Sequence, residues 1–386
     1  MNTLVNDIFS IETGQVTLLL PRKINGGRLS ELLERIPYVS ENVKSVSYSD
    51  QGHCAIINVE SSEADQMDLL RSDLQELVEA LLASKIAAQK TLKTRVRPSG
   101  LVSKKHVDDS MVYYNSADLK LIAGVDKLLV DIAIRHGASI REYGSIYSAE
   151  IMARNGYHKN FPQNVYGVTQ ISHNYALIKE IRESSSSTIP PGMFHSQGAF
   201  LQPCVCYHCY AEIQDSIQSN VLYTLKGRCF RHEIEWRLNN FRRNEFTMRE
   251  IVFMGSPEYV ESKRLTIMED VWALFGALGL YGQIVTARDP FFHYDDMKTK
   301  GAVQLMADAK YELEFISEAG HSSSIASFNN CQDTLCAKFG ITDFDSNVLH
   351  SGCVAFGIDR WRAALFEQYG GDCEVWPDLL NTSNNH

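Results

Sequence analysis

The pattern of hydrophobic and polar positions separates a small first part of the chain from a larger second part. In the first part, short runs of β-branched and aliphatic residues bounded by turn residues predict strands at residues 16–20 and 55–59. Leucines and valines at three- and four-residue steps then predict a helix over residues 64–92. We therefore expect a separate α+β module over residues 1–93.

The second part begins after a break in this periodicity. Pro98 lies in a segment typical of linkers, and we expect a linker over residues 94–112. A second helical pattern runs from Asp118 to His136 and ends at a glycine. Between residues 195 and 370, short strand-like runs alternate with irregular connections. This favours an antiparallel sheet flanked by helices in a domain over residues 113–380, an α+β fold.

Composition narrows the classes of protein that fit. A chain of 386 residues with 44% hydrophobic and 22% charged residues is typical of a globular protein with more than one domain. No stretch approaches the roughly 20 apolar residues that span a bilayer, and the start does not resemble a signal peptide, so we expect a cytoplasmic protein without membrane contact. A net charge of −10 makes nucleic acid an unfavoured default partner. The nine cysteines are better interpreted as thiols or metal ligands than as disulfides.

Three separated segments carry chemistry. The first has Arg231 and Glu233 two residues apart, and Arg242 and Phe246 follow it. The last contains the glycine–x–acid–arginine sequence that ends at Arg360. Arginine suits phosphate binding because its planar fork binds phosphate oxygens bidentately and stays protonated. An arginine–x–glutamate pair followed far downstream by such an ending resembles the motifs of class II aminoacyl-tRNA synthetases.

The resemblance extends from Val125 to Leu365. The chain is similar there to the atypical, zinc-dependent seryl-tRNA synthetases, and more similar still to their truncated relatives, the amino acid:[carrier protein] ligases. The matching segments occur in the family's order, namely Asn155-Gly156-Tyr157-His158-Lys159-Asn160-Phe161-Pro162, Asp289-Pro290-Phe291-Phe292, Lys310-Tyr311-Glu312-Leu313 and Ser327-Phe328-Asn329. The resemblance implies a class II synthetase-type fold and ATP-dependent activation of an amino acid.

The resemblance also implies roles for individual residues in ATP binding and catalysis. Arg231 would hold the α-phosphate and the carboxylate side of the amino acid. Glu233 would accept a hydrogen bond from the adenine amino group, and Phe246 would stack on the adenine. Arg242 and Arg360 would reach the outer phosphates. No side-chain base is required, because the carboxylate of the amino acid is already anionic.

Cys206, Glu250 and Cys353 would hold zinc, as the resemblance implies. Two thiolates and one carboxylate fill three of four tetrahedral positions, which leaves one position for the amino group of the substrate. The sequence around Cys206 aligns with the "LLPTAC" segment of the ligases, so we expect nearby Cys204 and Cys209 to serve packing.

Other positions carry weaker signals. Ser327 and Asn329 would contact the amino acid substrate. The glutamate that helps hold Mg²⁺ in the seryl enzymes has no clear equivalent, because Ser324 stands there. Glu312 and Glu314 are alternatives, and we place Glu314 among the ATP-binding residues; both also fit the outward face of a strand. The proline pair that follows the dimer-forming helix of the family is absent, but that helix is present, so we expect a homodimer.

Three functions fit these observations. We favour transfer of a small amino acid such as glycine, alanine or serine to the phosphopantetheine thiol of a carrier protein, because no long coiled-coil arm for tRNA is present. A tRNA-charging enzyme of the atypical seryl type is the second hypothesis, since the spacing from Glu233 to Glu250 fits that branch better. The third is a catalytically silent paralogue with a regulatory role. The function of residues 1–93, in acceptor docking or dimer support, stays open.

Overall fold

The computed structural model describes residues 9–12, 14–60, 64–83, 89–98, 114–287 and 308–381. These residues group into two compact units. The first draws on residues 1–93, 234–238 and 284–311, and the second on residues 94–233, 239–283 and 312–386. The predicted segment Asp289-Pro290-Phe291-Phe292 lies outside the described residues.

The first unit contains a four-stranded antiparallel sheet in the order β1-β2-β4-β3. Two helices pack on it, and leucines of both helices share one core with Val16, Leu18 and Ile57 of the sheet. The predicted strands of this region are confirmed. The elements are β1 (Phe9–Glu12), β2 (Gln15–Leu19), α1 (Gly26–Arg35), β3 (Val43–Ser49), β4 (Cys54–Val59) and α2 (Ala64–Ala83).

The prediction of a helix through Leu92 is wrong. Helix α2 ends at Ala83, and Thr91–Arg95 form strand β5. Strand β5 is the edge strand of an eight-stranded sheet, in which it pairs with β12 (Gly282–Thr286). The leucine periodicity ends before this point, and hydrogen bonding to a strand far along the chain decides the conformation of Leu92.

The eight-stranded sheet is the framework of the second unit. Its order is β5-β12-β13-β14-β15-β11-β10-β6, antiparallel at each pairing from β14 to β10, and β6 runs parallel to β10. The predicted antiparallel sheet is therefore confirmed, and its strands β10 to β15 lie within the region where strand-like runs were expected. The remaining strands are β6 (Ser139–Arg141), β10 (Val221–Phe230), β11 (Glu245–Gly255), β13 (Lys310–Ile316), β14 (Ser322–Gln332) and β15 (His350–Gly357).

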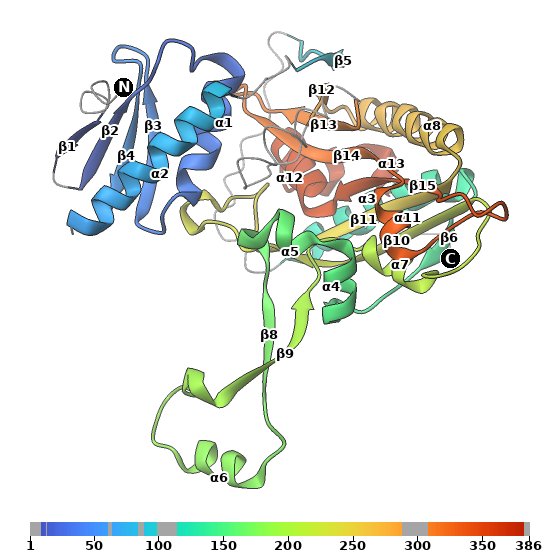
Figure 1. Cartoon of the computed structure of the whole chain (residues 1–386). Coiled ribbons are helices and arrows are strands. Elements are labelled where there is room, and N and C mark those ends of the chain that lie inside the picture. Colours follow the sequence, from blue (N-terminus) through green and yellow to red (C-terminus); the bar gives the residue numbers. More distant parts are fainter. Residues whose placement is uncertain are drawn as a thin grey trace. The chain divides into compact units, whose positions relative to one another are not determined.

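Helices cover the two faces of this sheet differently (Figure 1). One face packs against three long helices, α3 (Ser116–Arg135), α8 (Pro257–Ala277) and α12 (Ile358–Tyr369). Helix α3 confirms the second predicted helix, and it begins with a capping box in which Asn115 accepts hydrogen bonds from the backbone of Ala117 and Asp118. On the other face lie the short helices α7 (Tyr207–Glu212) and α11 (Thr334–Phe339).

A long ribbon arm projects from the second unit (Figure 1). Strands β7 (Ile146–Tyr147), β9 (Phe194–Leu201) and β8 (Gly167–Ile171) form a three-stranded sheet, and helix α6 (Tyr175–Glu183) lies between β8 and β9 in sequence. The serine run at residues 184–187 is exposed and follows helix α6. Helices α4 (Ala149–Asn155), α5 (Tyr157–Asn160) and α13 (Asp378–Asn381) complete the second unit.

Candidate active site

The candidate active site lies on the sheet face that carries α7 and α11. The register places Glu250 of β11 opposite Ala355 of β15, and Val252 opposite Cys353. Because residues two apart on a strand share a face, Glu250 and Cys353 lie diagonally across two neighbouring strands of the same face. The sequence separates these residues by about a hundred positions, and strand pairing brings them together.

The loop between β9 and α7 brings Cys206 over this face. Gly227 of β10 permits the close approach, since an added Cβ there would lie 2.8 Å from both the Gln202 amide and the Val205 side chain. The backbone N–H of Val205 donates a hydrogen bond of 3.1 Å to Glu250 Oε1. The hydroxyl of Tyr147, a residue without solvent exposure, donates to the carbonyl of Cys204. The loop is therefore held from both sides.

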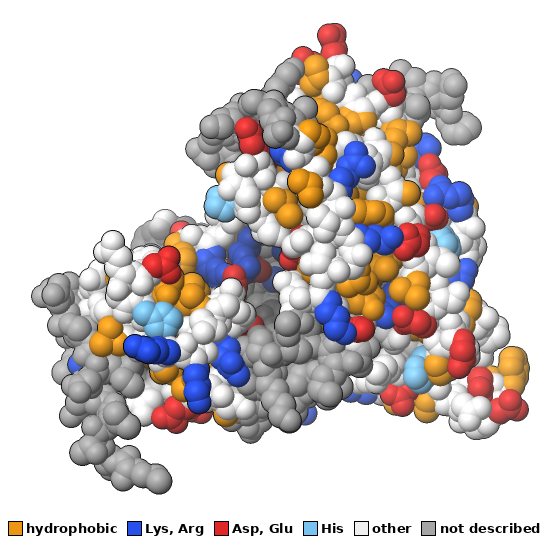
Figure 2. Space-filling view, turned by 90° about the horizontal axis from the view of Figure 1, so that it is seen from above, with side chains coloured by type: hydrophobic (Ala, Val, Ile, Leu, Met, Phe, Trp, Pro, Cys, Tyr) orange, Lys and Arg blue, Asp and Glu red, His pale blue; other side chains and the backbone are white. Residues whose placement is uncertain are grey.

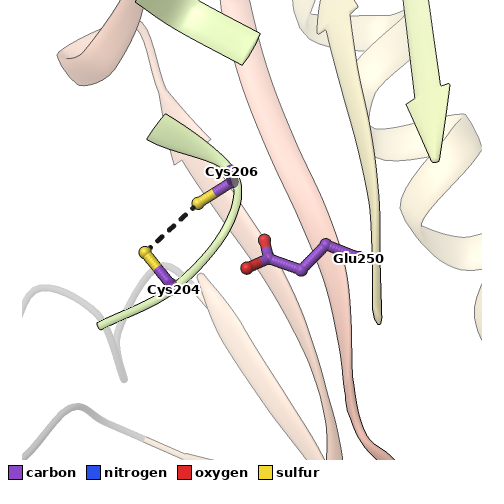
Figure 3. A group of neighbouring side chains, drawn as sticks. All are labelled: Cys204, Cys206 and Glu250. Carbon is purple, nitrogen blue, oxygen red and sulfur yellow. Dashed lines mark hydrogen bonds between the residues drawn. The ribbon is translucent and has the colours of Figure 1, made fainter. Parts of the chain in front are cut away.

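Thiols and one carboxylate gather where this loop meets the sheet. The ligand atoms of Cys204, Cys206 and Glu250 lie within 4.8 Å of one another, and the two sulfurs are 3.6 Å apart. Figure 3 shows the Glu250 carboxylate directed toward both thiols. Cys353 influences the pKa values of Cys206 and Glu250 from the neighbouring strand, but its sulfur is outside the group whose ligand atoms lie within 4.8 Å of one another. Two of the predicted zinc ligands, Cys206 and Glu250, thus lie together with Cys204, and the third, Cys353, lies beside this group on β15.

The electrostatics of this cluster favour a cation. Glu250 is only 1% exposed, and its Oε2 atom has no hydrogen-bond partner. Burial raises the pKa of the Glu250 carboxyl, and hydrogen bonds to Cys204 and Cys353 together with burial raise the pKa of the Cys206 thiol. Buried carboxylates and thiolates without a partner are costly, and a bound metal ion reverses that preference because it stabilises their charged forms. The donor set fits zinc, which prefers sulfur, nitrogen and carboxylate ligands.

The predicted substrate residues lie beside this cluster. Asn329 of β14 pairs with Cys353 in the sheet, and its amide group donates to Ser327 Oγ at 3.0 Å. The same amide lies 3.5 Å from Cys353 Sγ. Ser327 and Asn329 therefore form a polar border on the β14 side of the thiol cluster.

A hollow of about 310 Å³, counted with the space open to solvent, lies on the second unit. Four residues predicted to bind ATP line it, namely Arg231, Glu233, Phe246 and Arg360. Five lining residues were not predicted, namely Asn240, Phe241, Arg243, Gly357 and Asp359. The hollow combines cationic, aromatic and polar side chains, and this combination suits a nucleotide with its phosphates.

Three arginines line the hollow, and two of them, Arg231 and Arg360, were predicted to bind phosphates. The guanidinium of Arg231 lies 5.2 Å from the centre of the Phe246 ring, and its Nε donates to the carbonyl of Pro203 at 3.0 Å. Arg231 thereby joins the hollow to the loop that carries Cys204 and Cys206. Arg360 lies in the first turn of α12 and donates to the carbonyl of Ser324 at 2.8 Å. Burial and the nearby positive charge of Arg231 lower the pKa of Arg360 to about 10.

The other two predicted ATP-binding residues do not line the hollow themselves. Arg242 pairs with Glu233 through an Nη1–Oε2 contact of 3.0 Å. Glu314 accepts a hydrogen bond of 2.8 Å from Gln283, and it does not belong to the lining of the hollow. Its neighbour on the same strand face, Glu312, acts electrostatically on Arg360. Of the two glutamates, Glu312 is thus the one that the structure brings to the arginines.

The most informative residue that the sequence left unnoticed is Arg243. Its Nη1 donates to the Tyr114 hydroxyl at 2.5 Å and lies 3.7 Å from Asp359. Asp359 is buried and also accepts hydrogen bonds from Tyr114 and from the backbone of Thr247. This network fixes the start of α12 against β11, and therefore the position of Arg360. Asp359 is the acidic residue of the glycine–x–acid–arginine sequence, and an acid there was the signal that a partner such as Arg243 was needed.

Comparison with known proteins defines the class. Residues 196–369 match the family described as the tRNA synthetase class II core domain (G, H, P, S and T). They contain β10, β11, β14 and β15, which carry the site. Residues 196–369 therefore carry a class II synthetase core, and this core together with the ligase relatives below supports an amino acid ligase.

The individual relatives are of two kinds. Amino acid--[acyl-carrier-protein] ligase 1 of Bradyrhizobium diazoefficiens is 28% identical over 249 residues, which cover 62% of this chain and 74% of the ligase. Type-2 serine--tRNA ligase of Methanococcus aeolicus is 25% identical over 284 residues, which cover 69% of this chain. The match spans 54% of that enzyme, about half of its length.

Among solved structures, the chain is similar to M. kandleri SerRS in its crystal structure with A. aeolicus tRNASec. The TM-score is 0.67 at 17% identity, and the alignment covers 95% of this chain and 76% of that one. This likeness shows the fold. Within the described residues, no helix is long and apolar enough to cross a membrane.

Proposed function

We propose that the protein activates a small amino acid with ATP and transfers the aminoacyl group to the phosphopantetheine thiol of a carrier protein. The observation that carries this proposal is the link between two sites on one sheet. Arg231 lines the hollow and also holds the loop of the thiol cluster through the Pro203 carbonyl. A nucleotide and an amino acid bound at these places would have their reacting groups near Arg231.

The residues of the hollow would have different roles in binding and activating ATP. The carboxylate of the amino acid attacks the α-phosphate, and pyrophosphate leaves. Arg231 and Arg360 would neutralise the charge that builds on the phosphate oxygens, as positioned cations do in phosphoryl transfer. Phe246 offers its ring to the adenine. Glu233 would accept from the adenine amino group, while its partner Arg242 would reach the outer phosphates.

The thiol cluster would hold Zn²⁺ through Cys206, Glu250 and Cys353. Bound there, the metal supplies a Lewis-acidic site that coordinates the amino group of the substrate. The protein's own residues orient the rest of the amino acid. Asn329 and Ser327 border the cluster, and their amide and hydroxyl groups can contact a small polar side chain. A pocket bounded in this way favours glycine, alanine or serine.

The ATP would bind together with Mg²⁺. Mg²⁺ prefers carboxylate and phosphate oxygens, and it retains several waters. Glu312 is near Arg360, whereas Glu314 is hydrogen-bonded to Gln283. Within the strand face that carries both glutamates, Glu312 is therefore the better candidate for the metal-bound phosphates, and Glu314 would act through Gln283.

A tRNA acceptor is the second candidate, and one observation favours it. The alignment with the SerRS structure covers 95% of the chain, so it includes the first unit, whereas the match to the carrier-protein ligase covers 62%. Surface charge favours the carrier protein. On the face in Figure 2, Lys and Arg side chains of the described residues stand among Asp and Glu side chains and do not form one continuous basic area. Strong tRNA binding depends on such areas.

The protein would act as a homodimer. Helix α3 and the edge strand β6 carry exposed apolar side chains, among them Ile134 (47% exposed) and Ile140 (60% exposed). An exposed edge strand flanked by apolar residues is a natural place for a second copy to pair.

The test combines both acceptors in one assay. The purified protein receives ATP, Zn²⁺, labelled amino acids, total tRNA and phosphopantetheine-loaded carrier protein. We expect label that resists ribonuclease and is released by thiols. Ribonuclease-sensitive label would instead establish tRNA charging. No label and no amino-acid-dependent pyrophosphate exchange would leave the silent paralogue as the answer.

A further inference from the structure

Cys204 is the member of the thiol cluster that the three-ligand zinc site does not use. Its sulfur lies 3.6 Å from the sulfur of Cys206, and both belong to the group whose ligand atoms lie within 4.8 Å of one another. Cys353 influences the pKa of Cys206 from β15. Two thiols and the Glu250 carboxylate therefore converge, and Cys353 lies beside them on the neighbouring strand. Together these four side chains offer one donor more than an open zinc site needs.

The backbone on either side of Cys204 is anchored, and this directs its side chain. The carbonyl of Pro203 accepts from Arg231, the carbonyl of Cys204 accepts from Tyr147, and the N–H of Val205 donates to Glu250. Figure 3 shows the Cys204 thiol on the same side as Cys206 and the Glu250 carboxylate. A residue that serves packing alone would not need to point at a buried carboxylate.

Glu250 provides the second, independent observation. It is 1% exposed, and its Oε2 atom is buried without a hydrogen-bond partner. A buried carboxylate oxygen without a partner destabilises the folded protein unless a ligand satisfies it. The cluster is thus shaped for a cation, and Cys204 is within reach of it.

We propose that Cys204 is a fourth, displaceable ligand of the metal. This inference rests on the metal site of the proposed function. Without substrate, Cys204 completes a closed tetrahedral set with Cys206, Glu250 and Cys353, as in structural zinc sites. When the amino acid arrives, its amino group replaces the Cys204 thiolate, and the proton that the ammonium group gives up passes to the released thiolate. The metal is retained more tightly between turnovers, and the amino acid binds more weakly because it must displace a ligand.

Cobalt substitution tests this directly, because thiolate-to-cobalt charge-transfer absorption grows with the number of thiolate ligands. The wild type is compared with Cys204→Thr, the residue type found in the carrier ligases' segment, and with Cys209→Ser. Cys209 is the matched control, since it is a fully buried thiol of the adjoining helix α7 that lies outside the group of three. Each protein is titrated with Co²⁺, then with each standard amino acid.

We expect the absorption of the wild type to fall by about one third in Cys204→Thr and to stay unchanged in Cys209→Ser. The cognate amino acid should lower the wild-type absorption by the same third and leave Cys204→Thr unaffected. Zinc transfer to a chelator should be faster in Cys204→Thr. Equal absorption in the wild type and Cys204→Thr would overturn the role of Cys204 while the metal site stands. Absence of Co²⁺ and Zn²⁺ binding by the wild type would overturn the metal site itself.

Discussion

Arg249 and Glu250 are neighbours on strand β11, yet their side chains lie on opposite faces of the sheet and differ in how fully they are hydrogen-bonded. Arg249 points toward helix α3, where Asp126 accepts hydrogen bonds from its Nε and, at 3.0 Å, from its Nη2. Thr224 accepts a further bond of 3.2 Å from Nη1. Glu250 points to the other face, where one of its oxygens accepts from Val205 and the other has no partner. Both side chains are at most 5% exposed.

The acids on the two faces show the same contrast. Burial opposes the charge of Asp126, but hydrogen bonds from Arg249 and Lys226 outweigh it and lower the pKa of Asp126. Burial raises the pKa of Glu250. On the face that packs against α3, α8 and α12, every charge of this group is matched, and the network stabilises the fold. On the face that carries α7 and α11, one oxygen of the Glu250 carboxylate is left for a ligand to match. Incomplete satisfaction of buried groups therefore distinguishes the face that binds from the face that stabilises.

The largest effect that we expect comes from breaking the matched face. Asp126→Ala leaves the buried guanidinium of Arg249 without its carboxylate, and the loss of one partner of a buried ion pair costs about 3–5 kcal/mol. Urea unfolding measures this loss. Glu250→Gln, one position from Arg249, is the matched variant, and without added metal it should shift the free energy of unfolding by less than about 1 kcal/mol. Equal losses in the two variants would erase the contrast between the faces.

On the face that carries the candidate site, Arg231→Ala should lower the rate of amino acid activation and leave the free energy of unfolding nearly unchanged. Loss of one preorganised cation at the reacting phosphate costs about 10²–10³-fold, or about 2.7–4 kcal/mol. Amino-acid-dependent exchange of pyrophosphate into ATP measures it. Arg228→Ala is the control, because Arg228 lies on β10, the strand that Arg231 directly follows, and its side chain is 51% exposed. A rate for Arg231→Ala within twofold of the control's would remove Arg231 from the reaction.

A smaller effect should follow from adding a side chain at Gly227, where the Cys204–Cys206 loop approaches the sheet closely. An added methyl group would meet Gln202 and Val205 at 2.8 Å, so Gly227→Ala forces the Cys204–Cys206 loop away from the sheet. Overpacking of this kind costs about 1–3 kcal/mol. We expect zinc affinity to fall as well, measured by competition with a chelator. Unchanged zinc affinity would show that the loop adjusts without moving its thiols.

The smallest expected effect is on the pH dependence of the free energy of unfolding. Because the folded-state pKa of Asp126 is lowered, its ionised form contributes stability that is complete above its ordinary pKa and is lost as the pH falls through the folded value. The difference in unfolding free energy between the wild type and Asp126→Asn should therefore shrink as the pH falls below about 4. Urea titrations at several pH values measure this difference. A constant difference would mean that Asp126 keeps its ordinary pKa in the folded protein.

Much of this site could be predicted from the sequence because its key residues lie in short motifs that resemble those of a known family. Arg231, Glu233, Phe246 and Arg360 were expected together, and they line one hollow. Strand register then accounts for the meeting of Glu250 and Cys353.

The remainder depends on tertiary structure that local patterns do not encode. Cys204 and Cys206 are two residues apart, and their shared direction follows from hydrogen bonds to Tyr147 and Glu250. Arg242 and Arg243 are consecutive, and the turn at Asn239–Arg242 decides which of them meets Asp359. No hydrophobic periodicity in the sequence distinguishes residues that are so close together in the chain.

The scattered origin of the thiol cluster also has a consequence for how the protein assembles. Its donors come from the loop after β9, from β11 and from β15, so they meet only once β11 and β15 have paired. Contacts between positions so far apart in the chain are slow to form, because chain closure costs entropy before the contact stabilises it. A newly made chain therefore cannot form the proposed metal site early in folding. Native metal uptake would mark the end of folding, and its rate in refolding experiments would follow the closure of this sheet.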